Sequence, residues 1–364
     1  MIIKVYAWIP RSHVHLAEIV NKIKKGAGEH NLEYGSDLRF TIKKYKGYKD
    51  IQFKLDGDGL YSLSINVKEG PVEEPAHKFY NEAKNLFMDL IKKYHRVTHT
   101  QIIEGILPIN YSTIVLSKKH HPVKDYEKIK AGRYTIYSNK KQAYVNDTFT
   151  YISGYKRKDV ESICDYLAFT NIASHFFFEM MNKMEQYHNG TKEVIRVLEY
   201  EPNNKLINNA YLNLDLVKKD AAESWTKIKQ GIDSLDRKEK IFSSNRFTST
   251  MSSLVKGLGV KESFQKLGAD KDYLSTLWTL LINHLNYVDT AVEARVNFTN
   301  MSVFRNNQWL SIINSGFVLG AIIMALFMIG TGQLNNLYSF VLLVVAWIIT
   351  YEVINYFVLK RNNN

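Results

Sequence analysis

The stretch "LSIINSGFVLGAIIMALFMIG", from Leu310 to Gly330, contains no charged side chain. A second apolar run, "LYSFVLLVVAWIITYEVINYFVL", extends from Leu337 to Leu359 and contains one charge, Glu352. Each run is about the twenty residues that a helix needs to cross roughly 30 Å of hydrocarbon. Two such runs in tandem predict a transmembrane hairpin, and the alternative is a pair of core helices in a soluble protein.

The charges around these runs predict their orientation. The chain has 364 residues and a formal net charge of +12. Arg305 precedes the first run, and Lys360 and Arg361 follow the second, whereas the segment 331–336 between the runs has no Lys or Arg. Basic residues flank membrane spans on the cytoplasmic side. We therefore expect a multi-pass protein of the inner (plasma) membrane with both termini in the cytoplasm.

The residues before the first run predict a long stalk helix. There is no proline after Pro202 and no glycine between Gly268 and Gly316. One helix from about Tyr273 to Ile329 would be roughly 85 Å long at ~1.5 Å per residue. Apolar residues at alternate spacings of four and three predict a coiled-coil seam. The seam consists of Leu274, Trp278, Leu281, Leu285, Val288 and Val292.

A polar series lies on the same predicted helix. Asn286, Glu293, Asn300, Asn307 and Asn314 recur every seven residues, so they stay near one face. In a ring of such helices this face would line a water-filled pore, with Gly316 and Gly320 on the opposite face for close helix packing. The alternative is that Asn300 and Asn307 are solvated and that Asn314 bonds to the second run. The predicted pore-lining residues are Asn300, Asn307, Ser311, Asn314, Val318, Ala321, Ala325 and Met328.

The rest of the chain reads as an α+β cytoplasmic domain followed by long helices. Alternating β-rich runs, with a turn at Asp56 to Gly59, predict strands before residue 150 and a helix at 75–94. From about Arg157 the pattern becomes helical, and the polar stretch Ser243 to Gly259 predicts a joint. The predicted organisation is 1–150 α+β domain, 151–258 helical region, 259–308 stalk, 309–330 first span, 331–336 outer loop, 337–359 second span and 360–364 cytoplasmic tail.

The search for chemical motifs favours binding over catalysis. The single cysteine, Cys164, excludes a disulfide framework and a cysteine metal cage. The chain has no phosphate loop, G-x-S-x-G or H-E-x-x-H motif, so we expect neither an enzyme nor a metal site. Basic clusters with aromatic neighbours are candidates for binding a small anionic nucleotide or the anionic inner leaflet, rather than nucleic acid directly; a solvated surface is the alternative. The candidate ligand-binding residues are Lys43, Lys44, Lys46, Lys118, Lys119, Arg157 and Lys158.

This order of elements resembles the CorA family of membrane ion transporters. The resemblance covers the whole chain at the level of architecture and is closest from Tyr273 to Asn364. It implies a homopentamer whose stalk and first span line a pore. CorA transporters carry a Gly-Met-Asn triplet at the outer end of the first span, which is absent here, so magnesium selectivity does not follow. The outer-loop residues predicted to line the mouth are Gly330, Thr331, Gly332, Gln333 and Asn335.

A missing triplet and a divergent basic domain are also features of the CRISPR-associated, type III branch of CorA-like proteins. That resemblance implies an antiviral defence effector that permeabilises the membrane when a nucleotide second messenger binds. The leading hypothesis is therefore a ligand-gated oligomeric channel. The alternatives are a divalent-cation transporter with a variant selectivity loop, for which the ligand is the cation, and a membrane-anchored binding module without a pore.

Overall fold

The structure is a computed structural model. It describes residues 1–10, 19–21, 29–95, 110–119, 134–138, 141–145, 148–200, 204–245, 247, 249–332, 336, 340–341, 344–345, 347–349 and 351. The chain divides into two compact units, which are described separately. Unit 1 comprises Met1–Tyr187 and Lys219–Leu280, and unit 2 comprises His188–Lys218 and Leu281–Asn364.

Unit 1 contains a nine-stranded sheet with the order β2-β3-β4-β5-β1-β6-β9-β8-β7. All described neighbouring pairs with a printed register are antiparallel except β6 with β9, which is parallel. The strands are β1 (Ile2–Trp8), β2 (Glu29–Tyr34), β3 (Asp37–Tyr45), β4 (Tyr48–Asp56), β5 (Leu60–Asn66), β6 (Tyr111–Ser117), β7 (Tyr134–Ser138), β8 (Lys141–Val145) and β9 (Phe149–Ser153).

The predicted hairpins are confirmed. Strands β3 and β4 pair along their length through a turn at Lys46 and Gly47, both with positive φ. Strands β4 and β5 meet at the predicted Asp56 to Gly59 turn, where Gly59 has a φ of 83° that an L side chain rarely adopts. The predicted helix at 75–94 is α2 (Glu73–His95), and Glu73 and Glu74 lie in its first turn.

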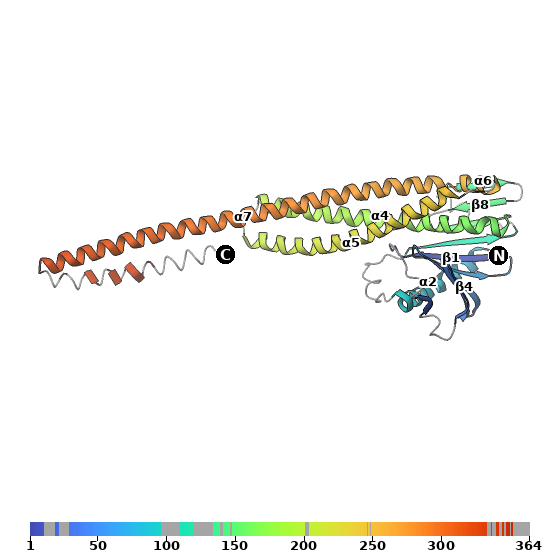
Figure 1. Ribbon diagram of the computed structural model, residues 1–364, viewed down its shortest axis with the longest axis horizontal. Helices are drawn as coiled ribbons and strands as arrows, with labels where there is room; N and C mark the ends of the chain where they lie inside the picture. Colours follow the sequence, from blue (N-terminus) through green and yellow to red (C-terminus); the bar gives the residue numbers. More distant parts are fainter. Residues whose placement is uncertain are drawn as a thin grey trace. The chain divides into compact units, whose positions relative to one another are not determined.

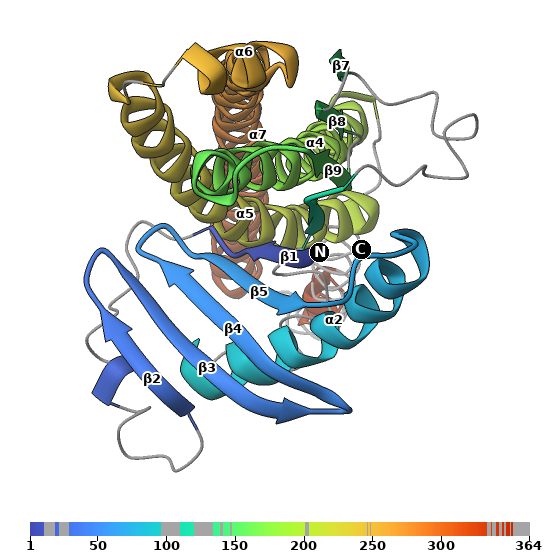
Figure 2. The same cartoon turned by 90° about the vertical axis from the view of Figure 1, so that its right-hand side faces the viewer.

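One face of the sheet is apolar and is covered by α2 (Figure 2). Side chains on a strand alternate between the two faces, so Ile3, Val5 and Ala7 of β1 point to the same side. They form a buried core with Phe53 of β4, Phe87 of α2 and their neighbours. The inward residues of these strands therefore fix the position of α2 on this face.

The long helices that follow the sheet are α4 (Arg157–Tyr200), α5 (Asn204–Ser244), α6 (Ser249–Gly257) and α7 (Val260–Gly330). Within unit 1, aromatic residues join α4, α5 and α7. Phe264 of α7 stacks on Phe169 and Phe242, at centroid distances of 6.3 and 5.1 Å. Trp225 of α5 stacks on Trp278 of α7 at 4.8 Å. The bundle is close-packed, because Gly231 of α5 lies directly against the Phe176 ring.

The stalk helix extends further toward its N-terminus than the continuous helix expected from about Tyr273, and its start agrees with the predicted stalk segment 259–308. Helix α7 begins at Val260, directly after Gly259, whose φ of 62° separates it from α6. The buried residues Val260, Phe264 and Leu267 continue the spacing of four and three, so packing extends the helix toward its N-terminus. The predicted joint was partly wrong, because the sequence Ser249–Gly257 within it is helical.

Unit 2 contains the remainder of α4, α5 and α7. Lys218 of α5 pairs with Asp289 of α7 at 2.5 Å, and the rings of His188 and His284 stack at 4.6 Å. Leu281, Leu285 and Val288 of the predicted seam are buried. The seam prediction is therefore confirmed for this part of α7.

Among the residues that the structure describes, one helix segment has the length and composition to cross a membrane. It extends from Phe304 to Gly330 with a mean hydropathy of 2.3, and none of it is buried inside the chain. It lies in α7, which Figure 1 traces as an unbroken helix from Val260. The second predicted run, 337–359, lies largely outside the described residues. Of those that are described there, Trp347 stacks on Phe317 at 3.9 Å.

Candidate functional site

The second face of the sheet in unit 1 is polar near strands β3, β4, β5 and β1. Alternation places Lys4 and Tyr6 of β1 opposite the apolar core residues of the same strand. The strand registers then align neighbours across the sheet. One row runs from Glu33 through Arg39, Lys54 and Ser62 to Tyr6, and a second runs from Thr41 through Gln52 and Ser64 to Lys4.

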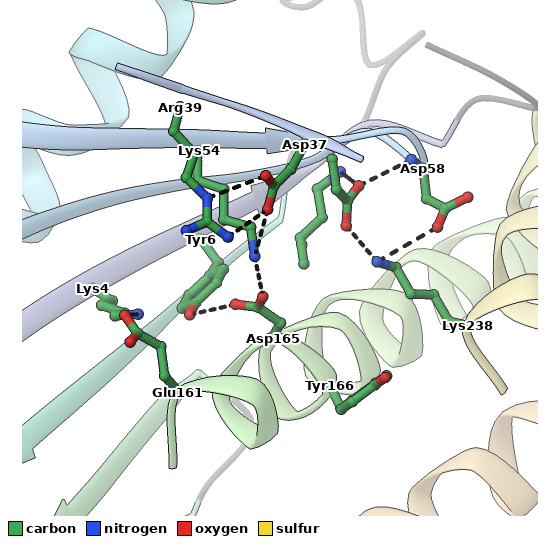
Figure 3. A network of polar contacts seen from close by, with 12 residues as sticks. Lys4, Tyr6, Asp37, Arg39, Lys54, Asp58, Glu161, Asp165, Tyr166 and Lys238 are labelled. Atoms are coloured by element: carbon green, nitrogen blue, oxygen red, sulfur yellow. Dashed lines mark hydrogen bonds and ion pairs between the residues drawn. The ribbon is translucent and has the colours of Figure 1, made fainter. Parts of the chain in front are cut away.

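Helix α4 supplies the opposite wall. Glu161 and Asp165 are four residues apart, so they project from one face of the helix. The Lys4 Nζ lies 2.9 Å from Glu161 Oε1, and the Lys54 Nζ lies 2.5 Å from Asp165 Oδ2. The Tyr6 hydroxyl donates a hydrogen bond of 3.0 Å to the other oxygen of Asp165. Figure 3 shows these contacts converging between the strands and α4.

A cavity of about 550 Å³ lies between these two walls. Its floor is buried, since Lys4, Ser62 and Ser64 expose 6%, 7% and 8% of their surface. Its rim is exposed at Glu33 and Arg39. The lining residues are Lys4, Glu33, Arg39, Phe40, Thr41, Gln52, Phe53, Lys54, Ser62, Ser64, Glu161, Ser162 and Asp165.

The charges around the cavity are paired. Burial lowers the pKa of Lys54, but the nearby carboxylate of Asp165 outweighs it, so the pKa is raised and the ammonium form is favoured. Burial raises the pKa of Asp37, but its hydrogen bond from Arg39 and the charge of Lys54 bring it below its usual value. Burial would also raise the pKa of Glu161, but the hydrogen bond and charge of Lys4, together with the charge of Arg157, bring it below its usual value. The cavity therefore presents formed cations and carboxylates to a ligand.

Tyr6 connects the cavity to the core. It is 1% exposed, and burial, followed by the charge of Asp165, raises the pKa of its phenol well above 10. The hydroxyl is therefore a hydrogen-bond donor at physiological pH and holds one oxygen of Asp165 in place. The other oxygen is left for Lys54, which fixes the carboxylate at the cavity wall.

A second ion-pair cluster anchors the Asp56 to Gly59 turn to α5. The backbone amides of Asp58 and Leu60 donate to Asp56 Oδ1 at 3.0 and 2.9 Å, and Lys238 pairs with Asp56. Arg237 contacts Asp58 at 2.6 Å. Burial raises the pKa of Asp56. Burial lowers the pKa of Lys238, but the charge and hydrogen bond of Asp56, together with the charge of Asp58, raise it above its usual value. Figure 3 shows this cluster beside the cavity.

The basic residues predicted to bind a ligand lie elsewhere. Lys43 and Lys44 are exposed on β3, and Lys46, at the hairpin turn, pairs with Glu82 at 3.1 Å. Lys118 and Lys119 are exposed after β6. Arg157 pairs with Glu161 at 3.7 Å and is the predicted residue that touches the cavity wall. The side chain of Lys158 lies outside the described residues. The described members of this set do not converge on one site.

Sequence reasoning missed Lys4, Arg39 and Lys54. A signal for Lys4 is visible, because this lysine interrupts the apolar strand "IIKVYAW". A buried cation needs a partner, so its position predicts a carboxylate from another element. Arg39 and Lys54 are at the polar positions of strands in which polar and apolar residues alternate. A face exposed to solvent has the same sequence pattern. Only the packing of α4 distinguishes the two situations.

The described residues that were predicted to line a pore lie in unit 2, and they fall into an exposed group and a half-buried group. Asn307, Ser311 and Val318 are exposed, whereas Asn314 is half-buried. The half-buried positions recur at helical spacing with Phe317, the residue that stacks on Trp347. The pore line stays a prediction, and the side chain of Asn300 lies outside the described residues. The half-buried predicted residues are Asn314, Ala321, Ala325 and Met328.

The predicted outer loop is described at its beginning. Helix α7 ends at Gly330, and the Thr331 hydroxyl donates to the carbonyl of Phe327 at 2.9 Å. Gly332 has a φ of 68°, and its amide donates to the carbonyl of Ile329. This is a helix C-terminus closed by a left-handed glycine. Gln333 and Asn335 lie outside the described residues.

Among the described residues, no group of three or more His, Cys, Asp or Glu side chains could hold a metal ion. Cys164 is fully buried, and burial raises the pKa of its thiol to about 12. The thiol is therefore protonated and unreactive at neutral pH. The polar cavity is thus the described feature of unit 1 with the volume and functional groups for binding a small molecule.

Comparison with known proteins does not assign this site. A scan against protein-family models finds no match for the chain, and a search of curated proteins finds no relative. The candidate site therefore rests on its own residues: a charge-paired polar cavity in unit 1 and an exposed apolar helix segment in unit 2.

Proposed function

We propose that the protein is an oligomeric membrane channel that is gated by a small molecule bound to its soluble unit. The main support for the proposal is that the environment of the apolar residues changes along α7. Within one unbroken helix the apolar residues are first buried at heptad spacing, whereas most of those between Phe304 and Gly330 are exposed and none is fully buried. A helix that is apolar all round requires a lipid or protein environment.

The proposed arrangement has two membrane spans, with both termini in the cytoplasm. The ring stack between Phe317 and Trp347 supports packing of the second apolar run on the first. In this arrangement α7 would transmit a change in the soluble unit to the span, because a continuous helix moves as a rigid element. A tilt of α7 in each subunit would then widen or wet the predicted polar line at Asn307, Ser311 and Asn314.

The resemblance to CRISPR-associated CorA-like effectors makes a nucleotide second messenger the first ligand to test for gating. The protein would be solubilised in detergent, and its mass measured with and without nucleotide second messengers; ion flux from protein-loaded liposomes would follow. A pentamer that conducts only with the nucleotide would support the proposal. A pentamer that passes magnesium unprompted would favour the divalent-cation transporter instead.

The membrane-anchored binding module is the second candidate. It is favoured by the half-buried stripe of Asn314, Ala321, Ala325 and Met328, because a residue packed on a neighbouring segment of its own chain cannot line a pore. Asn314→Leu separates the two candidates. We expect reduced conductance without loss of assembly if the channel is correct. Unchanged flux in this variant would remove Asn314 from the pore, and a monomer without flux would favour the anchor.

A further inference from the structure

The floor of the polar cavity in unit 1 contains a charged side chain whose burial costs free energy. Lys4 lies in the middle of the apolar strand β1, and its side chain is 8% exposed. Its one ion-pair partner among the described residues is Glu161, which is 44% exposed. Because an ammonium group has three donors, one carboxylate at 2.9 Å leaves donor capacity at the floor. The hydroxyls of Ser62 and Ser64 are buried beside it on the same face.

The lining charges of the cavity are balanced. Three cations, Lys4, Arg39 and Lys54, stand against three carboxylates, Glu33, Glu161 and Asp165. A polyanion would gain from the cations but would be repelled by the carboxylates of the α4 wall, and like charges close together cost several kcal/mol at an interface. A ligand that carries one charge of each sign meets no such penalty.

The position of each charge gives the orientation of such a ligand. A carboxylate could accept hydrogen bonds from Lys4 and from the serine hydroxyls at the floor. An ammonium group could then lie against Asp165 and Glu161 on the α4 wall. The side chain would extend toward the rim, where Arg39 and Glu33 are exposed. A volume of about 550 Å³ is sufficient for an amino acid or a dipeptide with bridging water.

We infer that this cavity binds a small zwitterionic ligand of the amino-acid or dipeptide class, with its carboxylate at Lys4 and its ammonium group at Asp165 and Glu161. The ligand would separate the Lys4–Glu161 pair, which joins β1 to α4. The inference rests on the proposed function only in making this ligand a gating signal. Binding itself is independent of any pore.

The test is isothermal titration calorimetry on the full-length protein in detergent, with free L-amino acids and then dipeptides as probes. Each compound that binds would be compared with its N-acetyl form, which lacks the ammonium charge, and with its methyl ester, which lacks the carboxylate. We expect Kd to rise about tenfold or more on loss of either charge, because each takes part in a charged hydrogen bond. Failure of all the zwitterions to bind would overturn the inference.

Matched variants locate the binding. Lys4→Met keeps the length of the side chain and removes the floor cation, whereas Lys43→Met removes an exposed cation on β3. We expect the first to abolish binding and the second to leave Kd unchanged. Ser162→Tyr, at an exposed position of the α4 wall, provides a second test if Lys4→Met does not fold. Equal binding by the wild type and Ser162→Tyr would contradict the assignment.

Inorganic phosphate and AMP form the anionic arm of the experiment. Binding of either one, with the same dependence on Lys4 and in place of the zwitterions, would overturn the inference in favour of an anion site. Liposome flux is measured separately with the zwitterion that binds. A zwitterion that binds at Lys4 without any change in flux would uphold the site and count against the proposed gating.

Discussion

The two parts of helix α7 contain similar apolar residues in opposite environments. In the first part, Leu274 and Leu281 are fully buried. In the second part, Leu319 and Ile323 are 63% and 60% exposed, although the helix is unbroken between them. The difference is one of pattern: a heptad stripe can be covered by two neighbouring helices, whereas apolar residues on every side require lipid or further helices.

The largest effect on the free energy of unfolding is expected in the first, buried part of α7. Leu281→Ala removes a fully buried side chain, and we expect the free energy of unfolding to fall by about 2–5 kcal/mol. Its neighbour Leu280 is 43% exposed, so Leu280→Ala should cost less than about 1 kcal/mol. Urea denaturation in detergent, followed by circular dichroism, measures both. Equal losses would mean that the heptad seam does not stabilise this part of α7.

The exposed part is tested by charge. Leu319→Arg places a cation in the middle of the apolar segment, and we expect insertion into a bilayer to become less favourable by about 2.5–3.5 kcal/mol. Leu216 of α5 is equally exposed, at 65%, but lies outside that segment. Leu216→Arg is therefore the control and should leave insertion unchanged. The membrane-bound fraction after flotation gives the result, and full retention of Leu319→Arg would argue against a span.

The two parts of the molecule also differ in packing density around their glycines, and we expect this difference to have a smaller effect on stability. A Cβ added at Gly231 would lie 2.7 Å from the Cε1 of Phe176, whereas one added at Gly320 meets nothing within 4 Å. We expect Gly231→Ala to destabilise the bundle by about 1–3 kcal/mol. Gly320→Ala should leave the bundle unchanged and stabilise its own helix by about 0.5–1 kcal/mol. Thermal unfolding of both variants measures these changes in stability. An unchanged stability of Gly231→Ala would show that the Phe176 ring can move aside.

The sheet differs from both parts of α7 in how its stability depends on acid. The substitution that tests this difference should have the smallest effect on the free energy of unfolding. Burial would raise the pKa of Glu69, but its bonds from the Ser117 hydroxyl, the Lys118 amide and the Met1 ammonium lower it to about 2. A depressed pKa means that the ionised form stabilises the fold above about pH 4.5. This contribution is lost as the pH falls from 4.5 toward 2.

Glu69→Gln should remove this part of the acid dependence. We expect a loss of about 1 kcal/mol at neutral pH, after allowing for the solvent that reaches this carboxylate, and a flatter stability profile between pH 4.5 and 2. Denaturant midpoints across this pH range provide the measurement, with Glu74→Gln as a control on the α2 surface. An unchanged profile in Glu69→Gln would assign the acid sensitivity to other carboxylates.

Much of the fold could be predicted because its signals are local. Alternation gave the hairpins β3–β4 and β4–β5, the helical pattern from about Arg157 indicated the long helices, and the spacing of four and three gave the seam of α7. The predicted stalk segment began at 259, but the continuous helix was expected only from about Tyr273, because Gly259 and the serine-rich segment before it look like a flexible joint. Burial of Val260 and Phe264 outweighs that local preference and continues the helix.

The candidate site was predicted less well. Clusters of basic residues are visible in the sequence, and they proved to be exposed and separate. The cavity depends on pairs that are remote in sequence: Lys4 and Glu161 are separated by 157 positions, and Lys54 and Asp165 by 111. No periodicity within one segment encodes such a pair, since the spacing between partners is set by how α4 packs on the sheet.

The sequence by itself determined the local features: which stretches are strands or helices, where the Asp56 to Gly59 turn lies, and that the run from Leu310 to Gly330 is uncharged and largely apolar. Backbone geometry and side-chain alternation act over a few residues, so they can be read directly. Only the tertiary structure decided which polar face became solvated and which became a cavity wall. That choice depends on α4 bringing Glu161 and Asp165 to Lys4 and Lys54, because a buried charge is stable only where another element supplies its partner.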